Sequence, residues 1–167
     1  LFFDVDFYQH AKDIYDEPKW PKEPLFYANF PSLTDNTAAP VGMESGFFLV
    51  PLAPGINDTE ALREEYFDKI IARFEALTQQ RIKNNIIFKK SFCKNEFVSE
   101  YNSYKGNAYG MANTLFQTAF LRPKLKSKKV KNLYFTGQLT VPGPGVPPAL
   151  ISGKLVSELI NKQFLEQ

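Results

Sequence analysis

Glycine and proline crowd one short stretch of the chain, Thr140 to Gly153, which reads TVPGPGVPPALISG. It holds four prolines and three glycines, two residues after the strand-like NLYFTG and directly before the amphipathic KLVSELINKQF. Glycine lets a main chain approach a ligand or take a positive φ, and a helix start offers N–H groups to an anion or an electron-rich ring. The stretch therefore favours a seat for a flat cofactor or a phosphate. A rigid turn without a ligand is an alternative that the composition leaves open.

Other chemistry is scarce in the sequence. Cys93 is the only cysteine and His10 the only histidine, which excludes a disulfide framework, a zinc site and nucleophilic catalysis with a histidine base. Any chemistry must then be supplied by a bound group.

Length and charge limit the class of protein. With 167 residues and 44% hydrophobic content, the chain is predicted to form one globular unit. A net charge of +2 gives no sign of a nucleic-acid partner, and no apolar run approaches the roughly 18 residues of a membrane span. The opening LFFDVDF lacks an initiator Met and the features of a signal peptide, so we expect the C-terminal piece of a longer cytoplasmic protein.

The elements that would position the Gly/Pro stretch read as a mixed α/β (α+β) fold, with a mostly antiparallel sheet covered by helices. Strands are predicted at 1–5, 24–30, 45–52, 84–92 and 132–137, with the second and third able to pair as antiparallel neighbours. Segment 106–120 is ambiguous between loop and helix.

Three helices are predicted before the Gly/Pro stretch. Asp6 and Gln9 resemble a capping box that opens the first helix. Asn57 or Asp58 is expected to cap the second, and the third is expected at 94–102. The expected apolar faces are Phe7, Ala11, Ile14 and Tyr15 in the first helix, and Leu62, Tyr66, Ile70, Phe74 and Leu77 in the second, which should cover a sheet.

A last helix should begin near Pro147 or Pro148, where a first turn accepts proline. Gly153 lies inside it and costs about 1 kcal/mol against alanine, which predicts a close approach of sheet, helix or ligand there. One broad apolar face of this helix is expected to pack on a sheet outside the chain, so that the fragment alone would self-associate. That face comprises Ile151, Leu155, Val156, Leu159 and Ile160.

The stretch from Asn132 to Ile160 resembles the C-terminal signature of bacterial phytoene-desaturase-type carotenoid desaturases, FAD-dependent flavoproteins related to the amine oxidases. Segments 1–15, 32–54 and 106–124 resemble successive blocks of the same family. The resemblance implies that 132–167 is the C-terminal strand-loop-helix of a Rossmann-like FAD domain and that 1–131 is part of a substrate-binding domain. It also implies a set of residues that line the FAD: Gly137, Gln138, Thr140, Pro142, Gly143, Gly145, Val146 and Pro147.

Two departures from the family pattern concern the cofactor. The GxGxxG that receives the pyrophosphate is absent from this sequence, so FAD is expected in the full-length protein, and the fragment alone is expected to be inactive. Gln138 stands where related flavoproteins often have an acidic residue that holds ribityl hydroxyls, and its amide can also bond hydroxyls.

The reaction that the resemblance implies is desaturation of a long polyene precursor in carotenoid biosynthesis. A hydride leaves an allylic carbon for the flavin and a proton leaves the neighbouring carbon, with no catalytic base evident in the sequence. Aromatic residues that could line the substrate side, with core packing as the alternative, are Tyr104, Tyr109, Phe116 and Phe120. The alternatives in function are a carotenoid isomerase or retinoid saturase of the same family, or a non-catalytic module that binds apolar ligands.

A basic segment precedes the last predicted strand. Its lysines favour peripheral contact with the cytoplasmic membrane, and a solvated loop is the alternative. They are Lys124, Lys126, Lys128, Lys129 and Lys131. Nearby Arg122 either contacts the cofactor or braces the Gly/Pro stretch, and the sequence does not decide between these roles.

Overall fold

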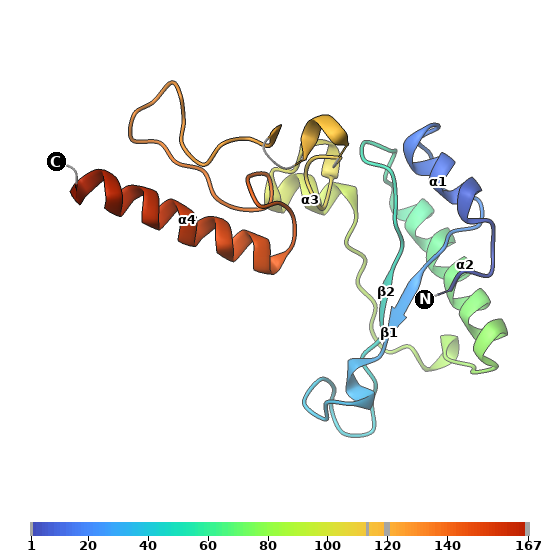
Figure 1. Ribbon diagram of the computed structural model, residues 1–167. Helices are drawn as coiled ribbons and strands as arrows, with labels where there is room; N and C mark the ends of the chain where they lie inside the picture. Colours follow the sequence, from blue (N-terminus) through green and yellow to red (C-terminus); the bar gives the residue numbers. More distant parts are fainter. Residues whose placement is uncertain (1, 113, 119–120, 166–167) are drawn as a thin grey trace. The chain divides into compact units, whose positions relative to one another are not determined.

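The computed structural model describes residues 2–112, 114–118 and 121–165, which divide into two compact units, Leu1–Asn107 and Ala108–Gln167 (Figure 1). The first unit holds α1 (Phe7–Tyr15), β1 (Tyr27–Asn29), β2 (Phe47–Leu49), α2 (Glu60–Thr78) and α3 (Lys94–Tyr101), and the second holds α4 (Val146–Leu165). The predicted mixture of helix and antiparallel sheet is confirmed in this coarse form. Among the described residues, no helix has the length and apolarity that crossing a bilayer requires.

The core of the first unit forms where α2 packs on the β1–β2 pair (Figure 1). The strands pair antiparallel with Ala28 opposite Phe48, as the sequence predicted. Tyr66, Ile70 and Phe74 of α2 are buried with Phe26, as the spacing of the helix predicted. Leu77 was expected on the same face and is exposed, because the last turn of α2 extends past this cluster.

The apolar face predicted for α1 is wrong for Phe7 and Tyr15, while Ala11 and Ile14 are half-buried. Asp6 caps the helix by accepting the N–H groups of Tyr8 and Gln9, but the Gln9 amide donates to Asp13 at 2.7 Å and does not complete a capping box. Phe7 and Tyr15 are exposed, and the residues that α1 buries are His10 and Asp13. Polar side chains can face inward here because both have partners for their polar atoms.

The buried His10 ring has a hydrogen-bond partner at each of its two nitrogens. Its Nδ1 accepts the N–H of Leu25 at 2.8 Å, so the ring proton lies on Nε2, which donates to the Pro51 carbonyl at 3.0 Å. The ring thereby ties α1 to the segments that lead into β1 and out of β2. The single histidine of the chain therefore has a structural role, which agrees with excluding a histidine base.

The N-terminus of α2 differs from the prediction by one residue. Thr59 is the N-cap, and its side chain accepts the Leu62 N–H at 3.3 Å. Asp58, one of the two predicted caps, does not serve because its carboxylate binds the Arg63 guanidinium and the Asn95 N–H instead.

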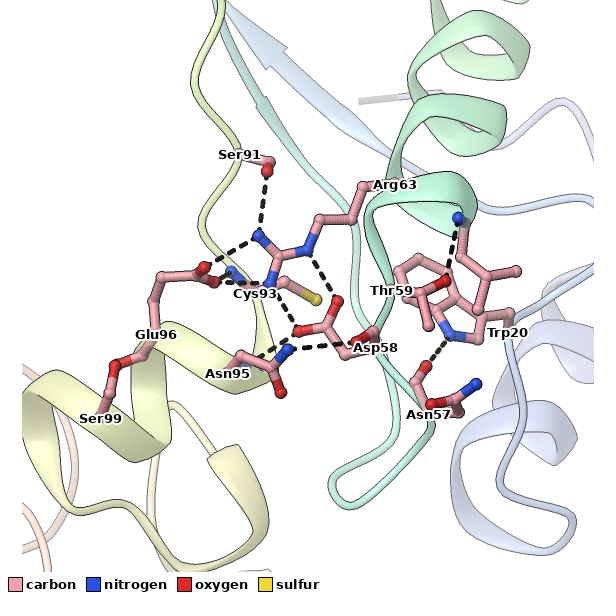
Figure 2. A network of polar contacts seen from close by, with 11 residues as sticks. Trp20, Asn57, Asp58, Thr59, Arg63, Ser91, Cys93, Asn95, Glu96 and Ser99 are labelled. Carbon is pink, nitrogen blue, oxygen red and sulfur yellow. Dashed lines mark hydrogen bonds and ion pairs between the residues drawn. The ribbon is translucent and has the colours of Figure 1, made fainter.

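Figure 2 shows the guanidinium of Arg63 between two carboxylates from different elements. Arg63 bonds Asp58 through Nε at 2.7 Å and Nη2 at 2.6 Å, and Glu96 of α3 through Nη1 at 2.9 Å and Nη2 at 2.8 Å. The side chains of Arg63, Asp58 and Glu96 are 10%, 0% and 26% exposed. Bidentate pairs of this kind are strong and directional, so the network fixes α3 against the start of α2.

The network also shifts the pKa values of its members. Hydrogen bonds from Arg63 lower the pKa of Asp58 and of Glu96 below their ordinary values, and the same bonds raise the pKa of Arg63. All three groups therefore remain charged at neutral pH.

Three predicted strands are wrong. Segment 1–5 contributes an isolated bridge between Phe2 and Phe26, and 132–137 contributes one between Tyr134 and Lys126. Segment 84–92 shares a 3₁₀ turn, Lys83–Asn85, and is otherwise irregular. These stretches have strand-like composition, but a strand needs a neighbour that pairs with several consecutive residues, and among the described residues segments 1–5 and 132–137 find such pairing only around a single bridge each.

The other short elements agree with the sequence more closely. The predicted third helix is confirmed as α3, and 106–120 contains a 3₁₀ turn at Leu115–Gln117. The predicted domain boundary at 131/132 refers to the complete protein and stays a prediction. The sequence boundary between the two compact units of this chain lies elsewhere, between Asn107 and Ala108.

Candidate functional site

The Gly/Pro corner, residues 137–148, is an irregular path into the first turn of α4. Gly137, Gly143 and Gly145 have φ of 100°, 141° and 112°, and the Val141–Pro142 peptide is cis. A residue with a side chain rarely adopts such φ values, so each glycine is required by the backbone path itself. Of the two uses of glycine that the sequence offered here, the structure shows the positive φ, and the approach to a ligand stays a prediction.

Two buried hydroxyls hold the corner together. The Ser152 Oγ accepts the Gly137 N–H at 2.7 Å and donates to the Ala149 carbonyl at 2.6 Å. Thr140 bonds the Gly137 carbonyl through its N–H at 3.1 Å and its Oγ1 at 2.8 Å. Ser152 thus ties the entrance of the corner to the first turns of α4, and Thr140 closes the turn that begins at Gly137. Both side chains are buried.

Arg122 packs against the corner and stabilises its path. Its side chain is buried, and its Nη1 donates to the Gln138 carbonyl at 3.1 Å. A Cβ placed on Gly143 would lie 3.4 Å from the Arg122 Cζ and Nε, so the guanidinium lies directly against this glycine. The Gln138 amide in turn donates to the Ala108 carbonyl at 3.2 Å. Of the two roles that the sequence left open for Arg122, the structure supports bracing.

The start of α4 offers fewer hydrogen-bond donors than an ordinary helix. Val146 is its first residue, and Pro147 and Pro148 follow in the first turn, as predicted. Neither proline has an N–H, and the Ala149 N–H already donates to the Gly145 carbonyl at 3.0 Å. With one N–H among its first three residues, this helix start suits the face or edge of a flat ring better than a phosphate, which needs several converging donors.

The residues predicted to line the FAD divide into two groups by exposure. Pro142, Gly145, Val146 and Pro147 are exposed and form the outer surface of the corner. Thr140 and Gly143 are buried beneath it, and Gly137 and Gln138 are half-buried. The exposed group presents main chain and proline rings with no charged side chain, which fits one side of a flat aromatic group.

The close approach predicted at Gly153 is not made by the residues that the structure describes. A Cβ added there would meet no described atom within 4 Å. The apolar face expected around it is also largely uncovered: Val156 is buried, while Ile151 and Leu159 are exposed. Leu155 and Leu159 line a hollow of about 350 Å³ together with Leu125. The second unit therefore carries an apolar helix face that its own described residues do not cover.

The four aromatic residues considered for the substrate side are placed as follows. Tyr104 lies in the first unit and is exposed. Tyr109 and Phe116 lie in the second unit and are also exposed, and Phe120 lies outside the described residues. The three that are described do not pack in the core of this chain, and their role in the complete protein stays a prediction.

Sequence reasoning missed the residues that hold the corner in place. Ser152 gives no signal because a serine inside a helix usually faces water, and only its complete burial shows its role. Gln163 near the end of α4 accepts from the Tyr134 hydroxyl at 2.5 Å and from Lys126 Nζ at 2.8 Å, and so ties the helix to the segment before the corner. Neither the contacts of Ser152 nor those of Gln163 follow a fixed spacing in the sequence that would allow them to be predicted.

No protein-family model matches the chain, but the similar proteins reported below are all named as desaturases. The chain is 43% identical over 160 residues to "Carotenoid 3,4-desaturase" of Haloarcula japonica, which covers 96% of this chain and 32% of that protein. It is 32% identical over 169 residues to "4,4'-diapophytoene desaturase (4,4'-diaponeurosporene-forming)" of Staphylococcus aureus, covering 96% and 34%. It is 31% identical over 161 residues to "zeta-carotene-forming phytoene desaturase" of Myxococcus xanthus, covering 95% and 31%. The chain spans about a third of the length of these relatives.

Proposed function

This chain corresponds to a segment of the carotenoid desaturases, and on that premise we propose that the complete protein is an FAD-dependent desaturase of a long polyene in carotenoid biosynthesis. The observation that carries the proposal is the 43% identity to Carotenoid 3,4-desaturase over 96% of this chain. A cytoplasmic location, peripheral on the cytoplasmic membrane, belongs to the same proposal because a long polyene dissolves in lipid and not in water.

The corner is proposed to hold one side of the FAD isoalloxazine ring. FAD supplies the acceptor for the two electrons when it is bound. Pro142, Gly145 and Pro147 offer flat, uncharged surface, and Val146 offers the one N–H of the helix start. Segment 132–167 belongs, in this proposal, to a Rossmann-like FAD domain whose pyrophosphate seat lies outside this sequence.

No residue between Gly137 and Pro148 has a side chain that titrates near neutral pH. The corner therefore binds and orients, and it neither takes nor gives the proton that desaturation releases. The exposed rings of Tyr109 and Phe116 are proposed to contact the polyene, since an apolar chain gains free energy by covering aromatic surface.

The function is tested by expressing the full-length gene in cells that accumulate phytoene, 4,4'-diapophytoene or lycopene. We expect new pigments that absorb at longer wavelength and have lost hydrogen, with the product mass lower by two for each double bond formed. A pigment of unchanged mass and altered geometry would indicate an isomerase, and a gain of hydrogen a saturase. No change with all three precursors would contradict the proposal.

The uncovered face of α4 leads to a prediction about the isolated chain. Because Ile151 and Leu159 are exposed on that face, the 167-residue chain is expected to self-associate and to bind a hydrophobic dye. In the full-length protein we propose that the remaining polypeptide covers this face, so dye binding should fall. Light scattering and dye fluorescence on both proteins check this. A monomeric isolated chain with no dye binding would refute it.

A further inference from the structure

A short basic hairpin precedes the corner in the second unit. The Phe135 N–H donates to the Leu125 carbonyl at 2.8 Å and the Ser127 N–H to the Leu133 carbonyl at 2.9 Å, which pairs the two arms. The Ser127 Oγ accepts the N–H groups of Lys129 at 3.2 Å and Val130 at 3.1 Å. The tip, residues 128–131, is thus held in a defined turn by its own hydrogen bonds.

The lysines of this hairpin have different environments. Lys126 is engaged within the unit, where its Nζ donates to Gln163 at 2.8 Å and lies 5.6 Å from the centre of the Tyr134 ring. Lys128, Lys129 and Lys131 are exposed at the tip, and among the described residues they form no ion pair. Three cationic groups are therefore concentrated on a few residues of ordered backbone.

Charge is divided unevenly between the two units. Ala108–Gln167 contains eight Lys or Arg residues and two Glu residues, which gives +6, while the chain as a whole has +2. Leu1–Asn107 therefore carries −4, from twelve basic and sixteen acidic residues. The sequence has no Asp or Glu between Glu100 and Glu158. Glu158 of α4 lines the same hollow as Leu125 at the base of the hairpin, and its carboxylate lies 3.8 Å from Lys154 Nζ.

An apolar residue lies among the charges at the tip. Val130 stands between Lys129 and Lys131 and its side chain is exposed, and Leu133 on the returning arm is exposed as well. A membrane surface combines anionic headgroups with an acyl boundary directly below them, and so it complements lysines that flank an apolar side chain. Nucleic acid would complement the lysines, but its backbone surface is charged, so an aliphatic side chain at the tip buries more apolar surface against a lipid boundary.

We propose that the tip of this hairpin, Lys128 to Lys131, is a docking site for an anionic lipid surface. Lys128, Lys129 and Lys131 contact the headgroups, and Val130 enters the boundary between headgroups and acyl chains. Lys126 takes no part because its ammonium group is held by Gln163. The inference rests on the peripheral membrane location proposed above and names the surface that makes the contact, but its test reads vesicle binding and does not depend on the desaturase activity.

The test is co-sedimentation of the full-length protein with vesicles of phosphatidylcholine alone or mixed with phosphatidylserine. Replacing Lys128, Lys129 and Lys131 together by Gln should weaken binding to the mixed vesicles about a hundredfold, since each lysine near an anionic surface contributes roughly a fivefold factor. Val130→Ser should weaken it further in that background. Lys126→Gln should leave binding within about twofold of the unmodified protein.

A matched control removes the same charge from the first unit, by replacing exposed Lys22, Arg81 and Lys90 with Gln. Binding should then stay close to that of the unmodified protein. An equal loss in this control would mean that net charge alone governs binding, and would overturn the proposal. Unchanged binding of the hairpin variant would overturn it too, as would tighter binding of the unmodified protein to duplex DNA than to the mixed vesicles at equal salt.

Discussion

Replacing Gly145 by valine in the full-length protein is expected to release FAD while both units stay folded. Gly145 has a φ of 112°, and an added Cβ would lie 3.4 Å from the Pro148 ring. A β-branched residue is strained at such a φ by about 1 to 3 kcal/mol, which the protein relieves by moving the corner away from its present path. A shift there removes the flat surface proposed for the cofactor, so flavin affinity should fall by roughly tenfold or more.

Flavin absorbance per purified protein measures this effect. Gly143→Val should behave similarly for a different reason, because its side chain would press on the guanidinium of Arg122. Gly42→Val is the matched control: Gly42 also has a positive φ, of 79°, but it lies in the first unit and an added Cβ would meet no described atom within 4 Å. Full flavin content in the Gly145 and Gly143 variants would show that the corner is a structural turn only, and would contradict the proposal that it binds FAD.

Replacing Arg63 by methionine is expected to cost the first unit about 3 to 5 kcal/mol of unfolding free energy at neutral pH. The change keeps the aliphatic stem but leaves Asp58 and Glu96 as two poorly solvated carboxylates without their common counter-ion. Urea unfolding followed by the fluorescence of Trp20, the only tryptophan of the chain, measures the effect. The indole donates to the Asn57 carbonyl at 2.6 Å next to the network, so its emission reports this unit. Lys69→Met is the control, because its pair with Glu65 is exposed and contributes less than about 1 kcal/mol.

The same variant reverses the dependence of stability on pH. In the unmodified protein Arg63 holds the pKa of Asp58 and of Glu96 below their ordinary values of 3.8 and 4.5. Their contribution is therefore fully present above pH 4.5 and is lost as the pH falls through the lowered values. Without Arg63, burial raises both pKa values, so the variant's deficit should shrink on acidification. A deficit that stayed constant down to pH 4 would contradict this account of the network.

The parts of the fold that the sequence predicted are those with a regular spacing of side chains. Tyr66, Ile70 and Phe74 repeat every four residues, and that repeat gave both the helix and its buried face. The positive φ values in the corner followed from glycine itself. Both kinds of inference depend on neighbours along the chain, where the spacing of residues carries the physical information.

The failures have one cause in common, which is a partner distant in sequence. His10 faces inward because Leu25 and Pro51 bind its ring. Asp58 does not cap α2 because its carboxylate binds Asn95, which is distant in sequence, together with the nearby Arg63, which Glu96 holds in place. Contacts of this kind do not appear as a regular spacing of residues in the sequence. The site shows the same limit: its glycines were visible in the sequence, and the buried Ser152 that holds them was not.

Cys93 makes the Arg63 network accessible to chemical measurement. It is the only thiol of the chain, its backbone N–H donates to Glu96 at 2.8 Å, and burial raises the pKa of its side chain. A protonated, half-covered thiol reacts slowly with alkylating reagents, and it reacts quickly once α3 separates from α2 and water reaches the sulfur. The rate of alkylation at Cys93 therefore reports how often this unit opens locally. Mass spectrometry measures it as the fraction of protein that has gained the mass of one alkyl group.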